Sequence, residues 1–79
     1  MRIPRNLGGD DLAAALCRAW DYTAVHQTGS HIILETGQPS HQRVAIPAHK
    51  ALRVGTLSSI LRAVSMHKGV SREAILESV

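Results

Sequence analysis

Histidine, lysine and arginine are concentrated in one part of this sequence. All five histidines lie between Tyr22 and Arg72, and the same segment carries six lysines and arginines against one acid, Glu35. An imidazole has an unperturbed pKa of about 6.5, so it can accept or donate a proton at neutral pH. The segment therefore predicts proton transfer on an anionic substrate or the binding of a polyanion. A solvated basic face that only favours solubility explains the charge alone equally well.

Cleavage of RNA is the reaction that needs the fewest protein groups from this set. The ribose 2′-hydroxyl is itself the nucleophile, so the protein has to supply a proton acceptor, a proton donor and positive charge near the phosphate. One well-placed acid or base contributes about 10² to 10⁴ in rate. Because DNA lacks the 2′-hydroxyl, RNA is the expected substrate if the protein is a hydrolase.

Other chemistries fit the sequence poorly. Two-metal nucleases need several acidic ligands, and the basic segment offers Glu35 alone. The histidines form no i, i+4 pair, and the single cysteine, Cys17, allows neither a multi-cysteine zinc site nor an intrachain disulfide. Cys17 falls inside an expected helix, where a small buried thiol is the common role. The sequence contains no Walker or dinucleotide motif, so we expect no metal and no cofactor.

Two amphipathic helices are expected, one before and one after the basic strands. Residues 10–20 carry apolar side chains at i, i+3, i+4 and i+7, and they follow Gly8-Gly9 with acids in the first turn. A second stripe of the same spacing begins after Gly55-Thr56 and ends at Gly69. Thr56 could cap this second helix, and its backbone amides could also receive a phosphate.

Three short strands are expected between the helices. Residues 22–28 and residues 43–46 alternate between two sets of side chains, and residues 31–35 form an apolar run between them. Gly29-Ser30 suits the two-residue loop of a type II′ hairpin, since glycine adopts a positive φ easily. The cluster at residues 37–40 supplies the second turn. The strands therefore predict an antiparallel meander.

The order α-β-β-β-α predicts an α+β fold in which two helices cover one face of a three-stranded antiparallel sheet. Ser71 is expected to cap a short C-terminal helix, with Val70 and Ile75 packed as a hydrophobic staple. The 79 residues form at most one domain, residues 1–79, and 20 of them are Leu, Ile or Val, enough for a core. No apolar stretch is long enough to span a membrane, so we expect a cytoplasmic protein.

A two-residue loop at Gly29-Ser30 fixes which side chains share a face of the sheet. Thr28 then pairs with His31, and the pairing continues along the hairpin as far as Ala24 with Glu35. The side chains expected in the core are Val25, Ile32, Leu34, Val44 and Ile46. The side chains expected on the uncovered face are His26, Thr28, His31, Ile33, Glu35 and Arg43. This face therefore presents an imidazole beside a glycine turn, which is a usable place for chemistry on a phosphodiester.

Three motifs follow one another along the chain. They are Gln27-Thr28-Gly29-Ser30-His31, then Val44-Ala45-Ile46-Pro47-Ala48-His49, then Gly55-Thr56-Leu57-Ser58-Ser59-Ile60-Leu61. With the opening Pro4-Arg5-Asn6-Leu7 to Leu12 and the tail Ser71-Arg72-Glu73, they cover nearly the whole sequence. In this order and spacing they resemble the HicA family, the toxin components of bacterial toxin-antitoxin pairs.

The resemblance implies a fold similar to double-stranded-RNA-binding domains, metal-independent cleavage of mRNA and silencing by a HicB-like antitoxin. It also implies that His31 is the catalytic histidine. The expected RNA-binding residues lie in the hairpin, on the uncovered face and in the connector before the second helix: Gly29, Ser30, Arg43, His49, Lys50, Arg53 and Thr56. Arg62 is a further basic residue that could contact a phosphate.

The sequence departs from the family pattern at two places. Members often carry a histidine or a basic residue directly after the Gly-Ser-His triplet, where this chain has Ile32-Ile33. Many have Gly-Phe after the first helix, where this chain has Asp21-Tyr22. Asp tolerates a left-handed backbone better than most residues, so we expect the helix to end in the same way.

Two other functions remain open at this point. A non-catalytic RNA-binding module would use the same basic face, and His31 would then serve only the geometry of the turn. A protein-interaction domain would use the uncovered face as a docking surface. His26 could equally be a residue that only fills the open face. His49 could equally be a residue that only bonds the connector's backbone.

Overall fold

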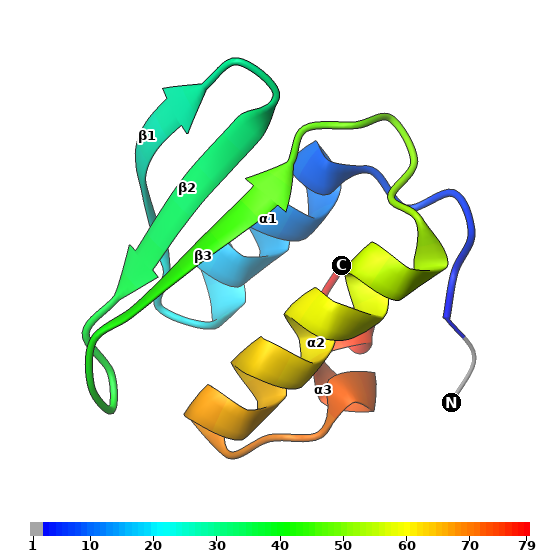
Figure 1. Cartoon of the computed structure of the whole chain (residues 1–79). Coiled ribbons are helices and arrows are strands. Elements are labelled where there is room, and N and C mark those ends of the chain that lie inside the picture. The colour runs from blue at the N-terminus through cyan, green and yellow to red at the C-terminus, as the bar shows by residue number, and fades with distance from the viewer. Residues whose placement is uncertain (1–2) are drawn as a thin grey trace.

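The helices and strands follow the predicted order, with a short helix at the C-terminus. The computed structural model describes residues 3–79, so residues 1 and 2 of the predicted domain lie outside the described residues. The elements are α1 (Gly9–Ala19), β1 (Thr23–Thr28), β2 (His31–Thr36), β3 (Gln42–Pro47), α2 (Val54–Lys68) and α3 (Arg72–Glu77). The strands form an antiparallel sheet in the order β1-β2-β3, with α1 and α2 on the same face (Figure 1). The predicted α+β fold is confirmed.

The apolar stripes of the two long helices form most of the core, as the periodicity predicts. The buried stripe residues are Leu12, Ala15 and Leu16 of α1 and Leu57, Ile60, Leu61 and Val64 of α2. Ala19, the fourth position of the first stripe, is exposed because α1 ends there. From the sheet, Ile32 and Leu34 of β2 and Val44 and Ile46 of β3 complete the same cluster, as predicted.

The start of α2 differs from the prediction. The helix begins at Val54, and Arg53 occupies the N-cap position with an extended backbone and no side-chain cap. The first backbone bond of the helix runs from the Leu57 amide to the Arg53 carbonyl oxygen at 2.9 Å. Thr56 therefore lies inside the first turn, and its predicted role as the N-cap is wrong. Gly69 ends the helix in a left-handed conformation, as expected.

The register of the β1–β2 hairpin agrees with the prediction only near the turn. Thr28 pairs with His31, but Ala24 pairs with Leu34 and not with Glu35. The register shifts between Ala24 and His26, and the extra residue of such a β-bulge leaves the ladder and redirects its side chain. Val25 is that residue and is 47% exposed, so its predicted place in the core is wrong.

Tyr22, the residue before β1, belongs to the core cluster, whereas Val25 does not. Its ring is buried, and its hydroxyl donates a hydrogen bond to Gln42 Oε1. Burial raises the pKa of the Tyr22 hydroxyl to about 12. Asp21, immediately before it, has a φ of 62°, the left-handed conformation expected at the end of α1. The chain can thus leave the helix and enter β1 within a few residues.

The C-terminal tail is fastened to both long helices. Ser71 Oγ accepts a hydrogen bond from the Ala74 amide at 3.1 Å, and Ile75 is fully buried with Val70 packed beside the core, so the predicted cap and staple are confirmed. At the far end, Ser78 receives hydrogen bonds from Trp20 Nε1 at 2.9 Å and from Arg18 at 2.6 Å. The tail therefore closes the side of the core that the sheet leaves open.

Candidate active site and nucleic-acid interface

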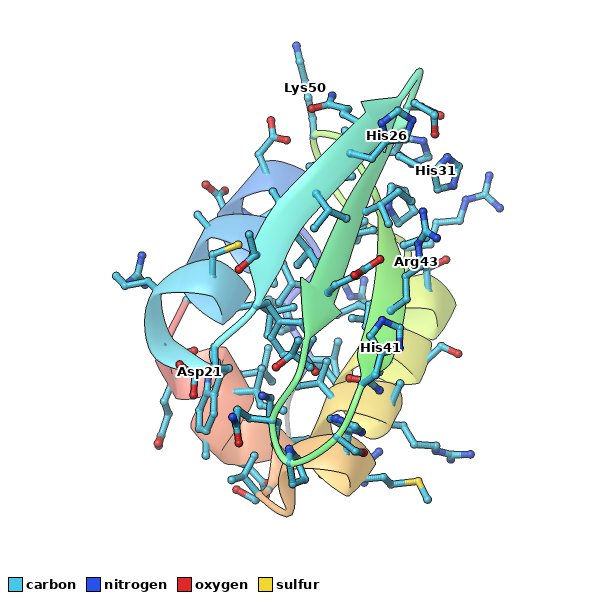
Figure 2. All side chains as sticks on the ribbon, turned by 90° about the vertical axis from the view of Figure 1, so that its left-hand side faces the viewer. Asp21, His26, His31, His41, Arg43 and Lys50 are labelled. Atoms are coloured by element: carbon cyan, nitrogen blue, oxygen red, sulfur yellow. The ribbon has the colours of Figure 1, made fainter. Side chains whose placement is uncertain are left out.

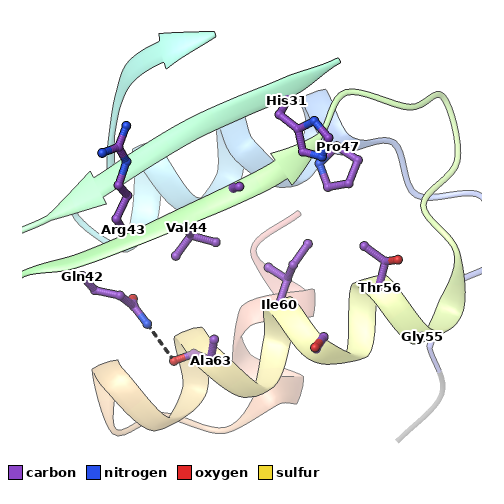
Figure 3. Close-up of a pocket in the computed structure, with 11 residues that line it drawn as sticks. His31, Gln42, Arg43, Val44, Pro47, Gly55, Thr56, Ile60 and Ala63 are labelled. Carbon is purple, nitrogen blue, oxygen red and sulfur yellow. Dashed lines mark hydrogen bonds between the residues drawn. The ribbon is translucent and has the colours of Figure 1, made fainter. Parts of the chain in front are cut away.

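A groove of about 560 Å³ lies between the edge strand β3 and the first half of α2 (Figure 3). Its residues come from both elements and from the start of β2: His31, Gln42, Arg43, Val44, Ala45, Pro47, Gly55, Thr56, Ser59, Ile60 and Ala63. At one end, Gln42 Nε2 donates a hydrogen bond to the Ala63 carbonyl oxygen at 3.1 Å. His31, Pro47 and Thr56 lie at the other end, as Figure 3 shows.

The groove exists because one side of α2 carries small side chains. Gly55, Ser59 and Ala63 recur every four residues, so they lie in one row along the helix. The sequence analysis identified the apolar stripe of α2 but not this second row. The i, i+4 spacing of small residues was the signal that could have predicted a hollow beside β3.

His31 is held at the mouth of the groove by the hairpin turn. It is the first residue of β2, directly opposite Pro47 of β3, and its side chain is exposed. Gly29 has a φ of 51°, which permits the tight turn that precedes it. The predicted accessibility of this imidazole is confirmed. That it also lines a groove at the edge of the sheet is a feature the sequence did not indicate.

Ser30 contacts the imidazole from the turn. Its Oγ lies 3.4 Å from His31 Nδ1, although neighbouring side chains of a strand normally point to opposite faces. The Ser30 carbonyl oxygen accepts a hydrogen bond from the Ala48 amide at 2.6 Å, which ties the hairpin to the connector. With Nδ1 beside this hydroxyl, Nε2 is the ring nitrogen left for a substrate.

The charges around the groove are mostly positive. Glu35 lies 3.7 Å from Arg43 and 3.5 Å from His41, and the Arg43 side chain stays 59% exposed. Figure 2 shows Arg43 between His31, near one end of the sheet, and His41, near the other. Across residues 3–79 no group of three or more His, Cys, Asp or Glu side chains is placed to hold a metal ion.

The structure brings together only some of the predicted site residues. His31, Arg43 and Thr56 all line the groove, and Gly29 and Ser30 form the turn that positions His31. The other three, which do not line it, are exposed residues of the connector and of the start of α2: His49, Lys50 and Arg53.

The connector is held by its backbone and by the buried Leu52, and the side chains of His49, Lys50 and Arg53 stay exposed. The His49 carbonyl oxygen accepts a hydrogen bond from the Gly9 amide at 2.9 Å, and the Leu52 amide donates to the Leu7 carbonyl oxygen at 2.8 Å. Gly9 lies so close to β3 that a Cβ atom there would be 1.8 Å from the Pro47 carbonyl oxygen. The sequence analysis recorded Gly8-Gly9 only as the start of a helix, and not as this close contact.

A membrane-spanning helix is absent from the described part of the chain, residues 3–79.

No curated protein and no solved structure matches the sequence significantly. The family described as the HicA toxin of bacterial toxin-antitoxin systems matches residues 9–66, which include α1, the whole sheet, the connector and most of α2. The match covers well over half of the 79 residues and contains the hairpin, the groove and the connector described above. The chain therefore belongs to the HicA toxin family and is the toxin of a toxin-antitoxin system, with a cognate antitoxin as its partner.

Proposed function

We propose that the toxin is a metal-independent endoribonuclease that cleaves mRNA, with His31 as its catalytic residue. The observation that carries this proposal is the exposed imidazole at the mouth of a groove, with a serine hydroxyl 3.4 Å from Nδ1. Attack by a ribose 2′-hydroxyl needs at least an accessible base beside a surface that binds the polyanion.

The reaction proceeds by proton transfer at His31 Nε2. As base, it takes the proton from the 2′-hydroxyl while the 2′-oxygen forms a bond to phosphorus and the bond to the 5′-oxygen breaks. The leaving 5′-oxygen takes a proton from water, so the products are a 2′,3′-cyclic phosphate and a 5′-hydroxyl. Ser30 acts as a positioning residue, because its hydroxyl restrains the ring through Nδ1.

Positive groups around the groove favour the negative charge that builds up on the phosphate. Arg43 lines the groove, and the first turn of α2 around Thr56 presents backbone amides at a helix N-terminus. Lys50 and Arg53 extend the positive surface along the connector, with Lys50 at the same end of the sheet as His31 (Figure 2). These contacts are to phosphate, so they favour RNA binding without reading its sequence.

The proposal extends to the partner and the setting of the toxin. We propose that the cognate antitoxin is a HicB-like protein, that residues 1–79 act as one domain, and that the toxin meets its mRNA substrate in the cytoplasm. Growth arrest on expression of the toxin, relieved by co-expression of an adjacent antitoxin gene, is the expected behaviour in cells.

The test is cleavage of a single-stranded RNA by pure protein in the presence of a chelator. The His31→Ala variant is expected to lose cleavage and growth arrest. His41→Ala is the matched control. His41 is another exposed histidine, directly before β3, and it does not line the groove. Cleavage by His31→Ala at the rate of the parent protein would refute the assignment.

A second function is supported by one feature of the groove. His31 is the one histidine among the residues that line it, so no second imidazole stands beside it for proton transfer. A non-catalytic RNA-binding module needs no such partner. This alternative predicts salt-dependent binding of RNA with no cleavage products at any pH.

A further inference from the structure

A second, smaller pocket of about 210 Å³ lies on α2 where α3 packs against it. Gly55, Ser58, Ser59, Arg62 and Arg72 line this pocket. Ser58, Ser59 and Arg62 share one face of α2, because residues three and four positions apart are neighbours on a helix. Arg72 is the first residue of α3, so the turn after Gly69 brings a second guanidinium to the same place. The pocket thus combines two arginines with two hydroxyls.

The two arginines carry charges that the described chain does not neutralise. Within residues 3–79 neither Arg62 nor Arg72 forms an ion pair with an acid, and no carboxylate lines the pocket. Two other cations are engaged, since Arg43 pairs with Glu35 and Lys68 donates hydrogen bonds to Thr36 and Gln38, whereas Lys50 and Arg53 of the connector also form no ion pair among the described residues. Two like charges at one pocket repel each other unless an anion joins them.

The groups that line the pocket have the chemistry of a phosphate site. A guanidinium presents a planar set of donors that matches two oxygens of a phosphate, and a serine hydroxyl can donate to a third. Both arginines are exposed, so an incoming anion meets them without any rearrangement of the fold. A neutral or cationic ligand would leave these donors unmatched.

The pocket continues from the groove that leads to His31. Gly55 and Ser59 line both, so the two hollows adjoin along α2. A chain with regularly spaced phosphates that lies along the groove from His31 can therefore continue into this pocket. A free phosphate ion binds at a single place, so it would not need the pocket to adjoin the groove.

We propose that Ser58, Ser59, Arg62 and Arg72 bind a backbone phosphate of the same RNA strand whose scissile phosphate lies at His31. The site positions the strand, and it acts on affinity and not on the chemical step. This inference rests on the proposed function, because the ligand it names is the substrate of that reaction. It adds a binding site on the α2–α3 surface beside the groove, of which the sequence alone indicated only Arg62 as a possible phosphate contact.

The test is the affinity of the full-length protein for a single-stranded 2′-O-methyl RNA, which cannot be cleaved by 2′-hydroxyl attack. We expect the double substitution Arg62→Gln and Arg72→Gln to weaken binding about tenfold or more at low salt. The slope of log K against log salt concentration should fall by roughly 0.7 to 1.4, as for the loss of one or two phosphate contacts. On cleavable RNA, KM should rise while kcat at saturation stays unchanged.

Two matched variants separate a site from a general charge effect. Arg18→Gln removes the same charge from α1, where the guanidinium is bonded to the Ser78 carbonyl oxygen, and should leave RNA affinity within about twofold. Arg62→Lys keeps the charge but loses the planar set of donors, so it should recover part of the affinity lost in Arg62→Gln. Thermal melts of all variants check that the fold is kept.

The inference and the proposed function fail in different ways. Parental affinity and salt slope in the double variant, or an equal loss in Arg18→Gln, would overturn the phosphate site and leave His31 untouched. Cleavage by His31→Ala would overturn the catalytic assignment. The affinity of the double variant for the 2′-O-methyl RNA would still test the phosphate site. Failure of the parent protein to bind any RNA would overturn both.

Discussion

The two ends of the sheet use their polar side chains in different ways. At the closed end, formed by Tyr22, residues 36–42 and Lys68, the polar side chains are bonded to other side chains and to backbone carbonyl oxygens. Lys68 Nζ donates hydrogen bonds to Thr36 Oγ1 at 2.8 Å and to the Gln38 carbonyl oxygen at 2.6 Å, and it lies 4.8 Å from the centre of the Tyr22 ring. His67 is also engaged there, 2.8 Å from the Ser40 carbonyl oxygen. The loop between β2 and β3 is therefore fixed to the end of α2.

At the open end, formed by residues 28–31 and 47–53, the backbone makes the contacts. The Ala48 amide donates to the Ser30 carbonyl oxygen, and the Gly9 amide donates to the His49 carbonyl oxygen. The imidazole of His31 has one side-chain neighbour within hydrogen-bond range among the described residues, Ser30 Oγ at 3.4 Å. Histidines and lysines of this end point into solvent, as Figure 2 shows for His31 and Lys50.

The comparison separates charge that holds the fold from charge that is free to bind. Counted along the sequence, Lys68 and Lys50 contribute equally to the basic segment. In the structure, Lys68 is committed to the loop while Lys50 is exposed and lies beside the proposed site. Substitutions at the closed end should therefore change stability, and substitutions at the open end should change RNA cleavage and binding.

The largest effect is expected for His31→Ala at the open end. Loss of a positioned acid or base should lower the rate of RNA cleavage by about 10² to 10⁴. Because the side chain is exposed, the free energy of unfolding should stay within about 0.5 kcal/mol of the parent value. Cleavage assays and urea melts on the same preparation check both halves. A large loss of stability would show that the His31 side chain helps to hold the fold, which would contradict the comparison of the two ends.

Gly9→Ala should break the backbone contacts that support the open end. A Cβ atom 1.8 Å from the Pro47 carbonyl oxygen forces α1 away from β3, and we expect a loss of about 3 kcal/mol, the upper end for overpacked sites. The control is Gly55→Ala in α2, where no atom lies within 4 Å of the new Cβ. It should be neutral or stabilising by up to about 1 kcal/mol. Equal melting of the two variants would contradict the close contact.

At the closed end, Tyr22 makes stability depend on alkaline pH. Its folded pKa of about 12 lies above the unfolded value of 10.0, so its contribution is complete below pH 10 and is lost as the pH rises towards 12. The unfolding free energy should fall by about 2 kcal/mol over that interval. Tyr22→Phe should flatten this part of the profile and cost about 1 kcal/mol at neutral pH through the lost bond to Gln42. Parallel profiles in the two proteins would be inconsistent with a buried hydroxyl.

Ser30→Ala should have the smallest effect of the series. Its hydroxyl makes one long contact with His31 Nδ1, so its loss should slow cleavage by about threefold to tenfold and leave the fold intact. Single-turnover rates at saturating RNA measure the change. Loss of all cleavage would instead make Ser30 a reacting group, and the positioning role proposed for it would be wrong.

The sequence predicted the features that depend on regular spacing. The order of elements, both apolar stripes, the Ser71 cap and the exposure of His31 follow from periodicity and turn chemistry, and the structure confirms them. The bulge at Val25 was not predicted, because an alternating pattern of side chains gives no sign of one extra residue in an edge strand. The burial of Tyr22 depends on tertiary packing that no local pattern encodes.

The sequence indicated some of the residues that line the groove but not its shape. His31 and Arg43 were identified from their types and positions, whereas the groove that joins them depends on how α2 packs beside β3. Thr56 belongs to that groove as a residue within the helix and not as its cap. The engagement of Lys68 with the loop likewise requires residues 32 positions apart in sequence to meet.

The most direct test of a metal-free histidine ribonuclease is the chemical nature of the RNA ends that the toxin leaves. Attack by the 2′-hydroxyl predicts fragments with a 2′,3′-cyclic phosphate or its 3′-phosphate hydrolysis product, and a 5′-hydroxyl, formed in the presence of a chelator. These fragments should be absent with His31→Ala and with RNA that carries a 2′-deoxy nucleotide at the cleaved position. Fragments with a 3′-hydroxyl and a 5′-phosphate, or cleavage that survives either substitution, would contradict the account.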